Sequence, residues 1–376
     1  MNKLLCFVDK EGEPQHSFID GMLAKRMSDE FDVTIYTSWN KLKDIRSTRY
    51  HNAKLCAYLF PRRGVFRLIN IFLVCFICLF KSLSNPKVKI ISFCRNEPSF
   101  LFGSYLVSFL SNFSYVFQSS FPHEDVSGGL KGKLAKVIFN ICGSRVKKIT
   151  AVSEEGLARM AKYFTCADGL VIPLMGDEVV DAPNDNVLDH IRFIYIGTLD
   201  KTREFEVVIN SFLKVATKEN RNFTLDVYGG TQEEWNSIVH KTQLNNLSNY
   251  NSNISYKGKV IRDKLFEIVT QYDVGISLVP KNEITSEMSP TKLSEYMACG
   301  LAVLASNTVT SQVSIVNQAK SGILADFTEE DIKNGVEWFL DNPEKLNGLK
   351  SHGLEYITNR FTYSSIKDNF SSFLTK

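Results

Sequence analysis

Residues 287–305 of this 376-residue chain read EMSPTKLSEYMACGLAVLA, a stretch that predicts a helix leading directly into a strand. Ser289 is a favourable N-cap, and Pro290 suits the first helical position, where its missing N–H would have no partner. Gly300 suits the position just after the helix, which commonly takes a left-handed conformation. The apolar residues 301–305 then indicate a buried strand. A helix with two defined ends and a strand behind it is typical of an α/β fold.

The same alternation of strand and helix extends over the whole chain. The expected strands are Leu4–Val8, Val33–Tyr36, Lys89–Phe93, Tyr115–Gln118, Ile149–Val152, Leu170–Ile172, Phe193–Ile196, Thr224–Tyr228, Ile254–Tyr256, Val274–Leu278, Ala302–Ala305 and Gly322–Leu324. The expected helices include Phe18–Glu30, Phe66–Leu83, Gly132–Phe139, Glu204–Lys214, Thr231–Thr242, Ile261–Ile268 and Pro290–Cys299. β-Branched strands joined by helical connections predict parallel sheets covered by helices on both faces.

The length and one polar segment indicate two domains. At about 150 residues per domain the chain has room for two, and residues 182–186, APNDN, form a turn-prone stretch near its middle. We therefore expect two facing Rossmann-like domains, residues 1–181 and residues 186–355, followed by a final helix in residues 356–376. Open α/β sheets bind ligands beyond the carboxyl ends of their strands, so the active site is expected among those loops.

The composition excludes several classes of protein. Apolar residues make up 44% and charged residues 23%, which is typical of globular proteins and not of disordered or collagen-like chains. The 44 Lys and Arg nearly balance the 41 Asp and Glu, so no nucleic-acid partner is expected. The eight cysteines are scattered, and Cys75 and Cys78 have no second pair at zinc spacing. Reduced, buried thiols are therefore expected, and with no export signal at Met1 the expected location is cytoplasmic.

Ten consecutive apolar residues, Ile71–Phe80, raise the question of a membrane. The run is shorter than the roughly 17–20 residues that a spanning helix needs, and Arg67, Asn70 and Lys81 limit its extension. One interpretation is a helix buried on all sides within the first domain. The other is an exposed apolar helix whose basic flanks contact an anionic membrane surface and a lipid-linked acceptor.

The start of the helix in residues 290–299 has the chemistry of a diphosphate site. Its first turn leaves the backbone N–H groups of Thr291 and Lys292 unpaired, and Lys292 adds an ammonium group. Glu287 lies just before the helix, and Glu295 lies between one and two turns into it. Carboxylates at these positions can accept hydrogen bonds from sugar hydroxyls.

Glu287 and Glu295 enclose seven residues, and residues 290–300 continue as PTKLSEYMACG. Together they resemble the E-x7-E element and the P-x-K-x-x-E-Y-M-A-x-G signature of retaining GT-B glycosyltransferases, especially glycosyltransferase family 4 of the bacterial surface-polysaccharide type. Further segments resemble this family in the same order, over most of residues 140–376. They are Ala151–Glu154 at a strand end, Tyr195–Arg203 in the first loop of the donor domain, Val227–Gly230 in a glycine turn, and the final helix.

The resemblance implies a GT-B fold whose C-terminal helix crosses back to the first domain. It also implies transfer of a hexose-type sugar, with retention, from a nucleoside-diphosphate sugar to a glycan or lipid-linked acceptor, in O-antigen or capsule synthesis at the cytoplasmic face of the inner membrane. Enzymes of this type need no metal and no cofactor besides the donor substrate, and the chain contains no Asp-x-Asp pair.

The resemblance also implies roles for individual residues. Glu287 would bind hydroxyls of the transferred sugar, Glu295 the nucleotide ribose, and Lys292 the diphosphate. Thr198 stands where the family has a basic residue after the glycine, so Lys201 or Arg203 takes that role here. The other candidates are Gly197, Thr291 and Leu293 for the donor, His123 in FPHED (residues 121–125) for catalysis, and His16 and Glu124 on the acceptor side.

Two other functions stay open. A sugar-nucleotide epimerase can have the same fold, and analysis of the reaction product would identify it. A non-catalytic nucleotide-sugar-binding partner of another transferase is the second alternative, against which the intact Glu287, Lys292 and Glu295 argue.

Overall fold

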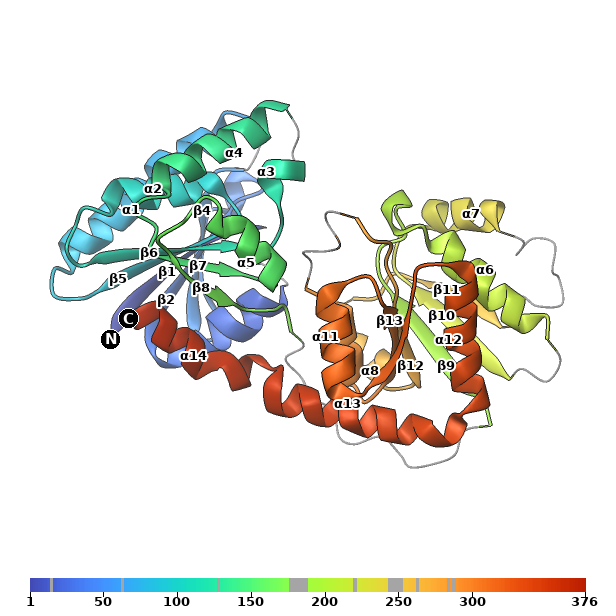
Figure 1. The fold of residues 1–376 in the computed structure, drawn as a ribbon. Helices are drawn as coiled ribbons and strands as arrows, with labels where there is room; N and C mark the ends of the chain where they lie inside the picture. The colour runs from blue at the N-terminus through green and yellow to red at the C-terminus, as the bar shows by residue number, and fades with distance from the viewer. Residues whose placement is uncertain are drawn as a thin grey trace. The chain divides into compact units, whose positions relative to one another are not determined.

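The computed structural model describes residues 1–13, 16–61, 64–126, 129–175, 189–218, 222–242, 253–261, 264–282, 285 and 289–376, without the side chains of His123 and Val126. They form two compact units (Figure 1). The first consists of Met1–Asp177, Glu287–Ser289 and Tyr363–Lys376, and the second of Glu178–Ser286 and Pro290–Thr362. Each is a Rossmann-like α/β unit, as the strand and helix pattern predicted. The expected boundaries at residues 181 and 186 lie outside the described residues.

The first unit is built on an eight-stranded sheet in the order β3-β4-β2-β1-β5-β6-β7-β8. The strands are β1 (Asn2–Glu11), β2 (Phe31–Ser38), β3 (Ser47–Tyr50), β4 (Ala53–Leu59), β5 (Ile90–Arg95), β6 (Phe113–Ser119), β7 (Lys148–Ala151) and β8 (Asp168–Val171). All neighbours are parallel except β3 and β4, an antiparallel hairpin at one edge. The apolar pattern did not predict this hairpin, because the edge strand β3 is polar and half exposed.

Helices cover both faces of this sheet (Figure 1). One face carries α1 (Phe66–Ser84), α2 (Pro98–Val107) and α4 (Gly129–Cys142), and the other carries the π-helix η1 (Phe18–Arg26) and α14 (Tyr363–Thr375). The remaining helical segments of this unit are η2 (Met27–Asp29), η3 (Leu42–Asp44), α3 (His123–Val126) and α5 (Glu154–Ala161). The helix expected over Phe18–Glu30 is therefore a π-helix followed by a short 3₁₀ turn.

The C-terminal helix α14 belongs to the first unit, although residues 290–362 before it belong to the second. The ring of Phe370 lies 6.2 Å from that of Phe18 and 5.8 Å from that of Phe93 of β5, between centroids. The Tyr363 hydroxyl lies 3.2 Å from the Ser17 hydroxyl, and Lys367 forms a 2.9 Å ion pair with Asp29. The final helix thus completes the core of the domain in which the chain begins, as the resemblance implied.

Helix α1 has an exposed apolar face. It is 19 residues long and therefore longer than the ten-residue apolar run. By length and composition alone it is long enough to cross a membrane. Only 22% of its apolar window is buried within the protein. Its buried stripe is Asn70, Ile71, Val74, Cys78 and Ser82. Asn70 bonds both backbone groups of Phe60, at 2.9 and 3.0 Å. The interpretation of a helix buried on all sides is therefore wrong.

The second unit is built on a six-stranded parallel sheet in the order β11-β10-β9-β12-β13-β14. The strands are β9 (Ile191–Ile196), β10 (Phe223–Tyr228), β11 (Ile254–Gly258), β12 (Val274–Ser277), β13 (Ala302–Ser306) and β14 (Gly322–Ala325). One face packs on α6 (Phe205–Ala216), α7 (Gln232–Lys241) and α12 (Glu329–Asp341), and the other on α8 (Leu265–Val269), α10 (Thr291–Ala298), α11 (Thr310–Ala319) and α13 (Leu346–Arg360).

Both sheets have a point at which the strand order reverses. In the first unit the chain leaves β1 for β2 on one side and later returns to β5 on the other. In the second it leaves β9 for β10 and returns to β12. Ligands of open α/β sheets bind beyond the carboxyl ends of the strands at these points.

Candidate functional site

The helix α10 begins one residue later than its sequence predicted. Pro290 is the N-cap, Thr291 is the first helical residue, and no side chain caps the helix. The hydroxyl of Ser289 instead accepts from the backbone N–H of Leu174 at 2.8 Å and donates to its carbonyl at 3.1 Å. The prediction of Ser289 as N-cap and Pro290 as first helical residue is therefore wrong, because that hydroxyl is engaged by a distant segment of chain.

The end of α10 follows the prediction. Gly300 has a φ of +73°. Its N–H bonds the carbonyl of Met297 at 3.0 Å, and the N–H of Leu301 bonds the carbonyl of Tyr296 at 3.0 Å. These are the two bonds of a Schellman motif, which closes the helix and directs the chain into β13.

Tyr296 fixes α10 against the sheet. Its side chain is fully buried, and its hydroxyl accepts from the backbone N–H of Ile196, the last residue of β9, at 2.8 Å. Its ring lies on Gly275 of β12, where an added Cβ would come within 2.2 Å of a ring carbon. Burial raises the pKa of the phenol well above its usual value, so the group stays neutral. The start of α10 is thereby held at the reversal between β9 and β12.

Lys292 and Glu295 form an ion pair on the first turns of α10. The Nζ of Lys292 lies 2.6 Å from Oε2 of Glu295, whose side chain is 4% exposed, whereas that of Lys292 is 38% exposed. The two predicted donor-binding groups are therefore in direct contact. Leu293 is fully buried, so only its backbone could contact a donor, and Thr291 is partly exposed. Glu287 lies outside the described residues.

The loop after β9 lies at the same carboxyl edge of the sheet. The hydroxyl of Tyr195 donates to the carbonyl of Thr198 at 2.8 Å, and Arg203 Nε donates to the Thr198 hydroxyl at 3.1 Å. Asp200 caps the short helix η4 (Lys201–Arg203) by accepting from the N–H of Thr202. Burial raises the pKa of Tyr195 to about 12, and the hydroxyl of Thr202 lowers that of Asp200. The cations of this loop are thus carried by a locally braced turn.

Two glycines let neighbouring loops approach each other. Gly197 follows β9 and Gly229 follows β10, on adjacent parallel strands. Gly229 has a φ of +109°, and a Cβ there would lie 1.9 Å from the Gly197 carbonyl oxygen. A side chain at either turn would push the β9 loop out of position.

A polar cluster occupies the corresponding edge of the first unit. Arg95, at the end of β5, is 2% exposed and forms an ion pair with Asp9 of β1. Its NH2 also lies 3.1 Å from the hydroxyl of Ser120 and 3.1 Å from Nε2 of His16. Arginine can only donate, so His16 Nε2 accepts and the imidazole proton is on Nδ1. His16 therefore lies at a strand-end cluster, and its acceptor-side role stays a prediction.

Sequence reasoning did not identify Asp9, Arg95 or Asn96. Asn96 donates to Asp9 Oδ2 at 3.1 Å, and its side-chain oxygen accepts from the N–H of Ser120 at 2.7 Å. The available signal was positional, because Asp9 directly follows one run that was expected to be a strand and Arg95 lies two residues after another. Their pairing depends on β1 and β5 being neighbours, which the sheet order determines.

Glu124 faces the interior of the first unit. Its carboxylate is buried and forms an ion pair with Arg159 of α5, which also donates to the hydroxyl of Ser119 at 2.8 Å. Direct contact of Glu124 with an acceptor stays a prediction. His123 begins the short helix α3, and its side chain lies outside the description. Within the described ranges no group of three or more His, Cys, Asp or Glu could hold a metal ion, and metal independence stays an expectation.

None of the eight cysteines, all of which lie in the described ranges, forms a disulfide. Six of the eight are buried, Cys75 is partly exposed and Cys166 is exposed. Burial raises the pKa of the Cys94 thiol to about 11 and that of Cys142 to about 12. The expectation of buried thiols is confirmed for six cysteines, and Cys75 and Cys166 are the exceptions.

Comparison with known proteins identifies the fold. Residues 179–355 match the family model described as Glycosyl transferases group 1. No curated protein sequence matches the chain at a significant level. Sucrose-phosphate synthase from Thermosynechococcus elongatus is 13% identical with a TM-score of 0.71, over 99% of this chain and 98% of that one. HepE from Anabaena, in complex with UDP and glucose, is 14% identical with a TM-score of 0.71, over 100% of both chains.

A glycosyltransferase from Rickettsia africae is a third similar structure, 15% identical with a TM-score of 0.66, over 99% of this chain and 97% of that one. These likenesses show that the chain has the GT-B fold, as predicted. Its second unit carries the part that matches the group 1 glycosyl transferase family, with α10 and the β9 loop inside it.

Proposed function

We propose that this chain, which has the GT-B fold and a group 1 glycosyl transferase domain in residues 179–355, is a retaining glycosyltransferase. It transfers a hexose-type sugar from a nucleoside-diphosphate sugar to a glycan or lipid-linked acceptor, in the synthesis of a cell-surface polysaccharide such as O-antigen or capsule. The observation that carries this proposal is the presence of Lys292 and Glu295 on the first turns of α10, inside that domain.

The donor is assigned to the carboxyl edge of the second sheet. The unpaired amides at the start of α10 and the ammonium of Lys292 face the developing charge of the departing diphosphate, with Lys201 or Arg203 from the β9 loop. Glu295 binds the ribose, and Glu287 binds hydroxyls of the transferred sugar. The structure of HepE with UDP and glucose, a protein of the same fold, supports a nucleotide-sugar donor.

The proposed retention of configuration at the sugar follows from attack and departure on the same face of the ring. In the proposed mechanism the acceptor hydroxyl approaches the same face of the sugar that the diphosphate leaves, and a phosphate oxygen takes the proton. His123 is proposed to assist at the sugar. No metal is required, because amides and cations already stabilise the leaving group where its charge develops.

The acceptor is assigned to the first unit. His16, Asp9 and Arg95 form its polar cluster at the strand ends, and the exposed apolar face of α1 supports peripheral contact with an anionic membrane. We place the enzyme in the cytoplasm, at the cytoplasmic face of the inner membrane.

The substitution Lys292→Ala tests this proposal. We expect turnover of the nucleotide sugar to fall by about 10²–10³-fold, the usual loss on removal of one group that stabilises the transition state. The matched control is Lys333→Ala, which breaks another i,i+3 Lys–Glu ion pair, with Glu330 on α12. Transfer from a panel of labelled nucleotide sugars is the measurement. Turnover of the Lys292→Ala variant at the wild-type rate would contradict the proposal. An epimerised donor as the sole product would show that the chain is an epimerase and not a transferase.

A further inference from the structure

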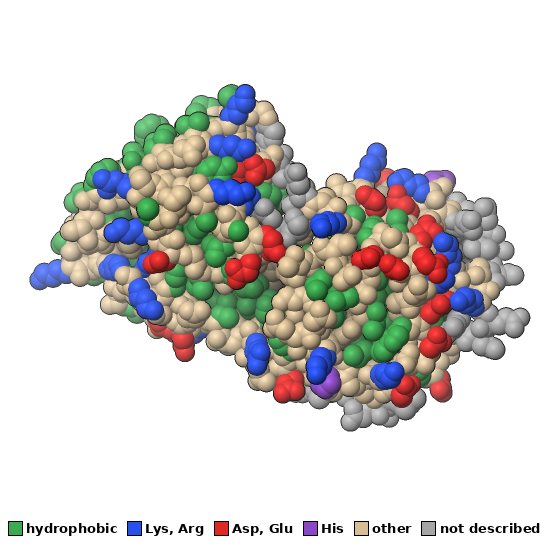
Figure 2. Space-filling model, in the orientation of Figure 1, with side chains coloured by type: hydrophobic (Ala, Val, Ile, Leu, Met, Phe, Trp, Pro, Cys, Tyr) green, Lys and Arg blue, Asp and Glu red, His purple; other side chains and the backbone are tan. Residues whose placement is uncertain are grey.

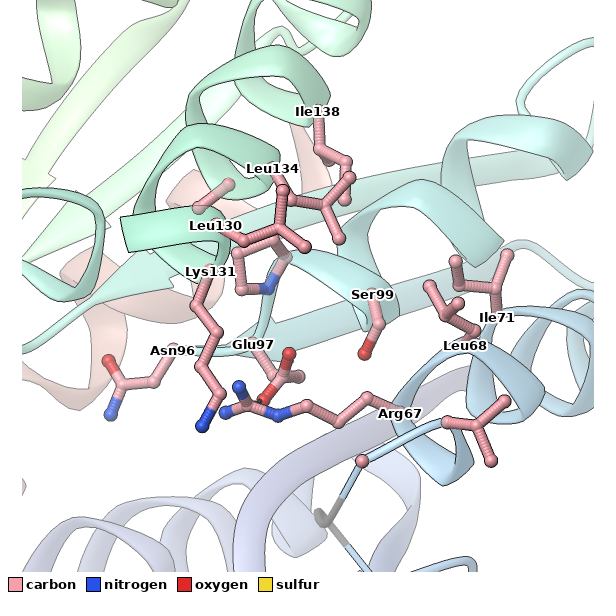
Figure 3. A pocket seen from close by; sticks show the side chains of 14 residues that line it. Arg67, Leu68, Ile71, Asn96, Glu97, Ser99, Leu130, Lys131, Leu134 and Ile138 are labelled. Carbon is pink, nitrogen blue, oxygen red and sulfur yellow. Dashed lines mark hydrogen bonds and ion pairs between the residues drawn. The ribbon is translucent and has the colours of Figure 1, made fainter. Parts of the chain in front are cut away.

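A groove lies between α1, the start of α2 and α4 in the first unit (Figure 3). Its volume is about 260 Å³. Its walls are apolar and come from two helices that are far apart in the sequence. Leu68 and Ile71 line it from α1, and Leu130, Leu134 and Ile138 line it from α4.

One end of the groove is polar and basic. Arg67 NH2 lies 3.0 Å from Oε2 of the buried Glu97. Lys131 of α4 extends to the same end, next to Asn96 (Figure 3). Two cations face one carboxylate there, so this end carries a net positive charge and complements an anionic group.

The polar end is continuous with the acceptor-side cluster. Asn96, which lines the groove, donates to Asp9 and accepts from Ser120. These residues lie at the carboxyl ends of β1, β5 and β6, where an open α/β sheet binds its ligands. A lipid-linked molecule held by the groove would therefore present its anionic head, and any glycan attached to it, at these strand ends.

The groove is flanked by an exposed apolar surface, which we call the α1–α4 face. It comprises Phe72, Phe76, Phe80 and Leu83 of α1 and Val137 and Ile141 of α4, with exposed fractions between 46% and 72%. Figure 2 shows apolar side chains gathered along the edge of the first unit where these helices lie, with lysine and arginine side chains near them. An exposed apolar surface of this kind is typical of contact with another apolar phase.

The chemistry of the groove favours an anionic lipid over an extended protein segment. Its walls between α1 and α4 are leucine and isoleucine side chains, which a hydrocarbon chain can contact without burying polar groups. An extended protein segment would bring backbone N–H and C=O groups that these apolar walls cannot pair. The cations at the polar end add a requirement for negative charge.

We propose that this groove binds the hydrocarbon chain and anionic head of a lipid-linked acceptor. The chain lies between Leu68 and Leu134, and the head contacts Arg67 and Lys131. The proposal rests on the proposed function, because it names a glycan carried on a lipid phosphate as the acceptor class whose hydroxyl receives the sugar.

Calorimetric titration of the full chain with dodecyl phosphate, kept below its critical micelle concentration, tests the groove. We expect Leu134→Asn and Leu68→Asn to weaken binding by at least about tenfold, because each removes one leucine contact with the chain. Lys131→Ala should weaken it several-fold through the head group. Val137→Asn is the matched control on α4, because Val137 is exposed on the same face but does not line the groove. Inorganic phosphate and dodecanol should each bind far more weakly than dodecyl phosphate.

Three results would contradict the proposal that the groove binds a lipid. They are equal losses in Leu134→Asn, Leu68→Asn and Val137→Asn, binding of inorganic phosphate as tight as that of dodecyl phosphate, or a dimer that dissociates on Leu134→Asn without any binding of dodecyl phosphate. The thermal unfolding midpoint of each variant shows whether it is folded. If the wild-type chain binds dodecyl phosphate but does not turn over any donor, the proposed transferase function is wrong and the groove proposal stands. If the chain turns over a donor but Leu134→Asn, Leu68→Asn and Val137→Asn lose equal affinity for dodecyl phosphate, the groove proposal is wrong and the transferase function stands.

Discussion

Lys292 and Glu295 illustrate how one ion pair can prepare a site. The carboxylate of Glu295 is almost fully buried and holds the ammonium of Lys292 at 2.6 Å, on the first turns of α10. In the donor site proposed above, the cation does not have to be ordered when a diphosphate binds, which lowers the entropic cost of binding.

Tyr296 is the residue on which the position of this pair depends. We predict that Tyr296→Phe lowers the free energy of unfolding by about 1–3 kcal/mol, because the buried N–H of Ile196 loses its acceptor. Nucleotide-sugar affinity should fall with it, since α10 loses its tie to β9. Urea unfolding and a titration with the donor measure the two effects.

The control for this prediction is Tyr356→Phe. The Tyr356 hydroxyl donates to Gln318 at 3.2 Å in an exposed bond between α11 and α13, so its loss should change stability by less than about 0.5 kcal/mol. Equal effects of the two substitutions would contradict the anchoring role of Tyr296.

At the scale of elements, Asp273 joins β9, β12 and α13 on the side of the sheet away from the site. Its buried carboxylate accepts from the backbone and side chain of Arg192 at 3.0 Å and from Lys350 Nζ at 2.8 Å. Burial alone would raise its pKa, but the bonds from Arg192 and the charge of Lys350 together hold it below the usual value. Three elements are thus tied through one carboxylate.

We predict that Asp273→Asn destabilises the second unit by about 3–5 kcal/mol at pH 7, because Lys350 is left buried without its counter-charge. A lowered pKa in the folded state means that ionisation of Asp273 contributes its full stability above about pH 4, the pKa range of an unfolded aspartate. This contribution disappears as pH falls through the folded-state pKa. Urea unfolding at pH 7 and pH 3 should therefore show a smaller difference between variant and wild type in acid.

Glu355→Gln is the control for this prediction. It changes an exposed carboxylate on the same helix α13, and it should leave both the stability and its pH dependence nearly unchanged. A gap between Asp273→Asn and wild type that is as large at pH 3 as at pH 7 would contradict the role given to the ionised carboxylate.

At the scale of the whole molecule, the chain returns to its first unit at the end. Phe370 of α14 packs on Phe18 and Phe93, whereas the described core of the second unit contains no residue of α14. We predict that Phe370→Ala destabilises the first unit by about 3–5 kcal/mol, the usual cost of a deleted core ring, and leaves the second unit nearly unchanged.

The three tryptophans separate the two units in this experiment. Trp39 lies in the first unit, and Trp235 and Trp338 lie in the second. Single-reporter variants therefore follow each unit by fluorescence during urea unfolding. Phe373→Ala, which removes a partly exposed ring on the same helix, is the control. An equal shift in both units would show that α14 does not act through the first core alone.

Much of the fold could be predicted from local patterns. Period-two and helical apolar runs located all six strands of the second unit and six of the eight in the first, and missed β3 and β4, whose edge hairpin breaks the parallel pattern. In α10, Gly300 marked the end correctly because its left-handed turn is a local requirement. The prediction of Ser289 as the N-cap was wrong, because its hydroxyl bonds the backbone of Leu174 instead of the first turn of the helix.

The sequence by itself therefore determined the α/β alternation, the parallel sheets and the position of α10 with its lysine and glutamate. These depend on residues that are close in the chain. Only the tertiary structure decided that Asp9, Arg95, Asn96 and His16 meet, that Glu124 faces Arg159, and that α1 keeps an apolar face exposed. The physical reason is that strand order decides which strand ends are adjacent, and neighbouring helices decide which face of α1 is covered. Apolar residues alone do not specify either arrangement.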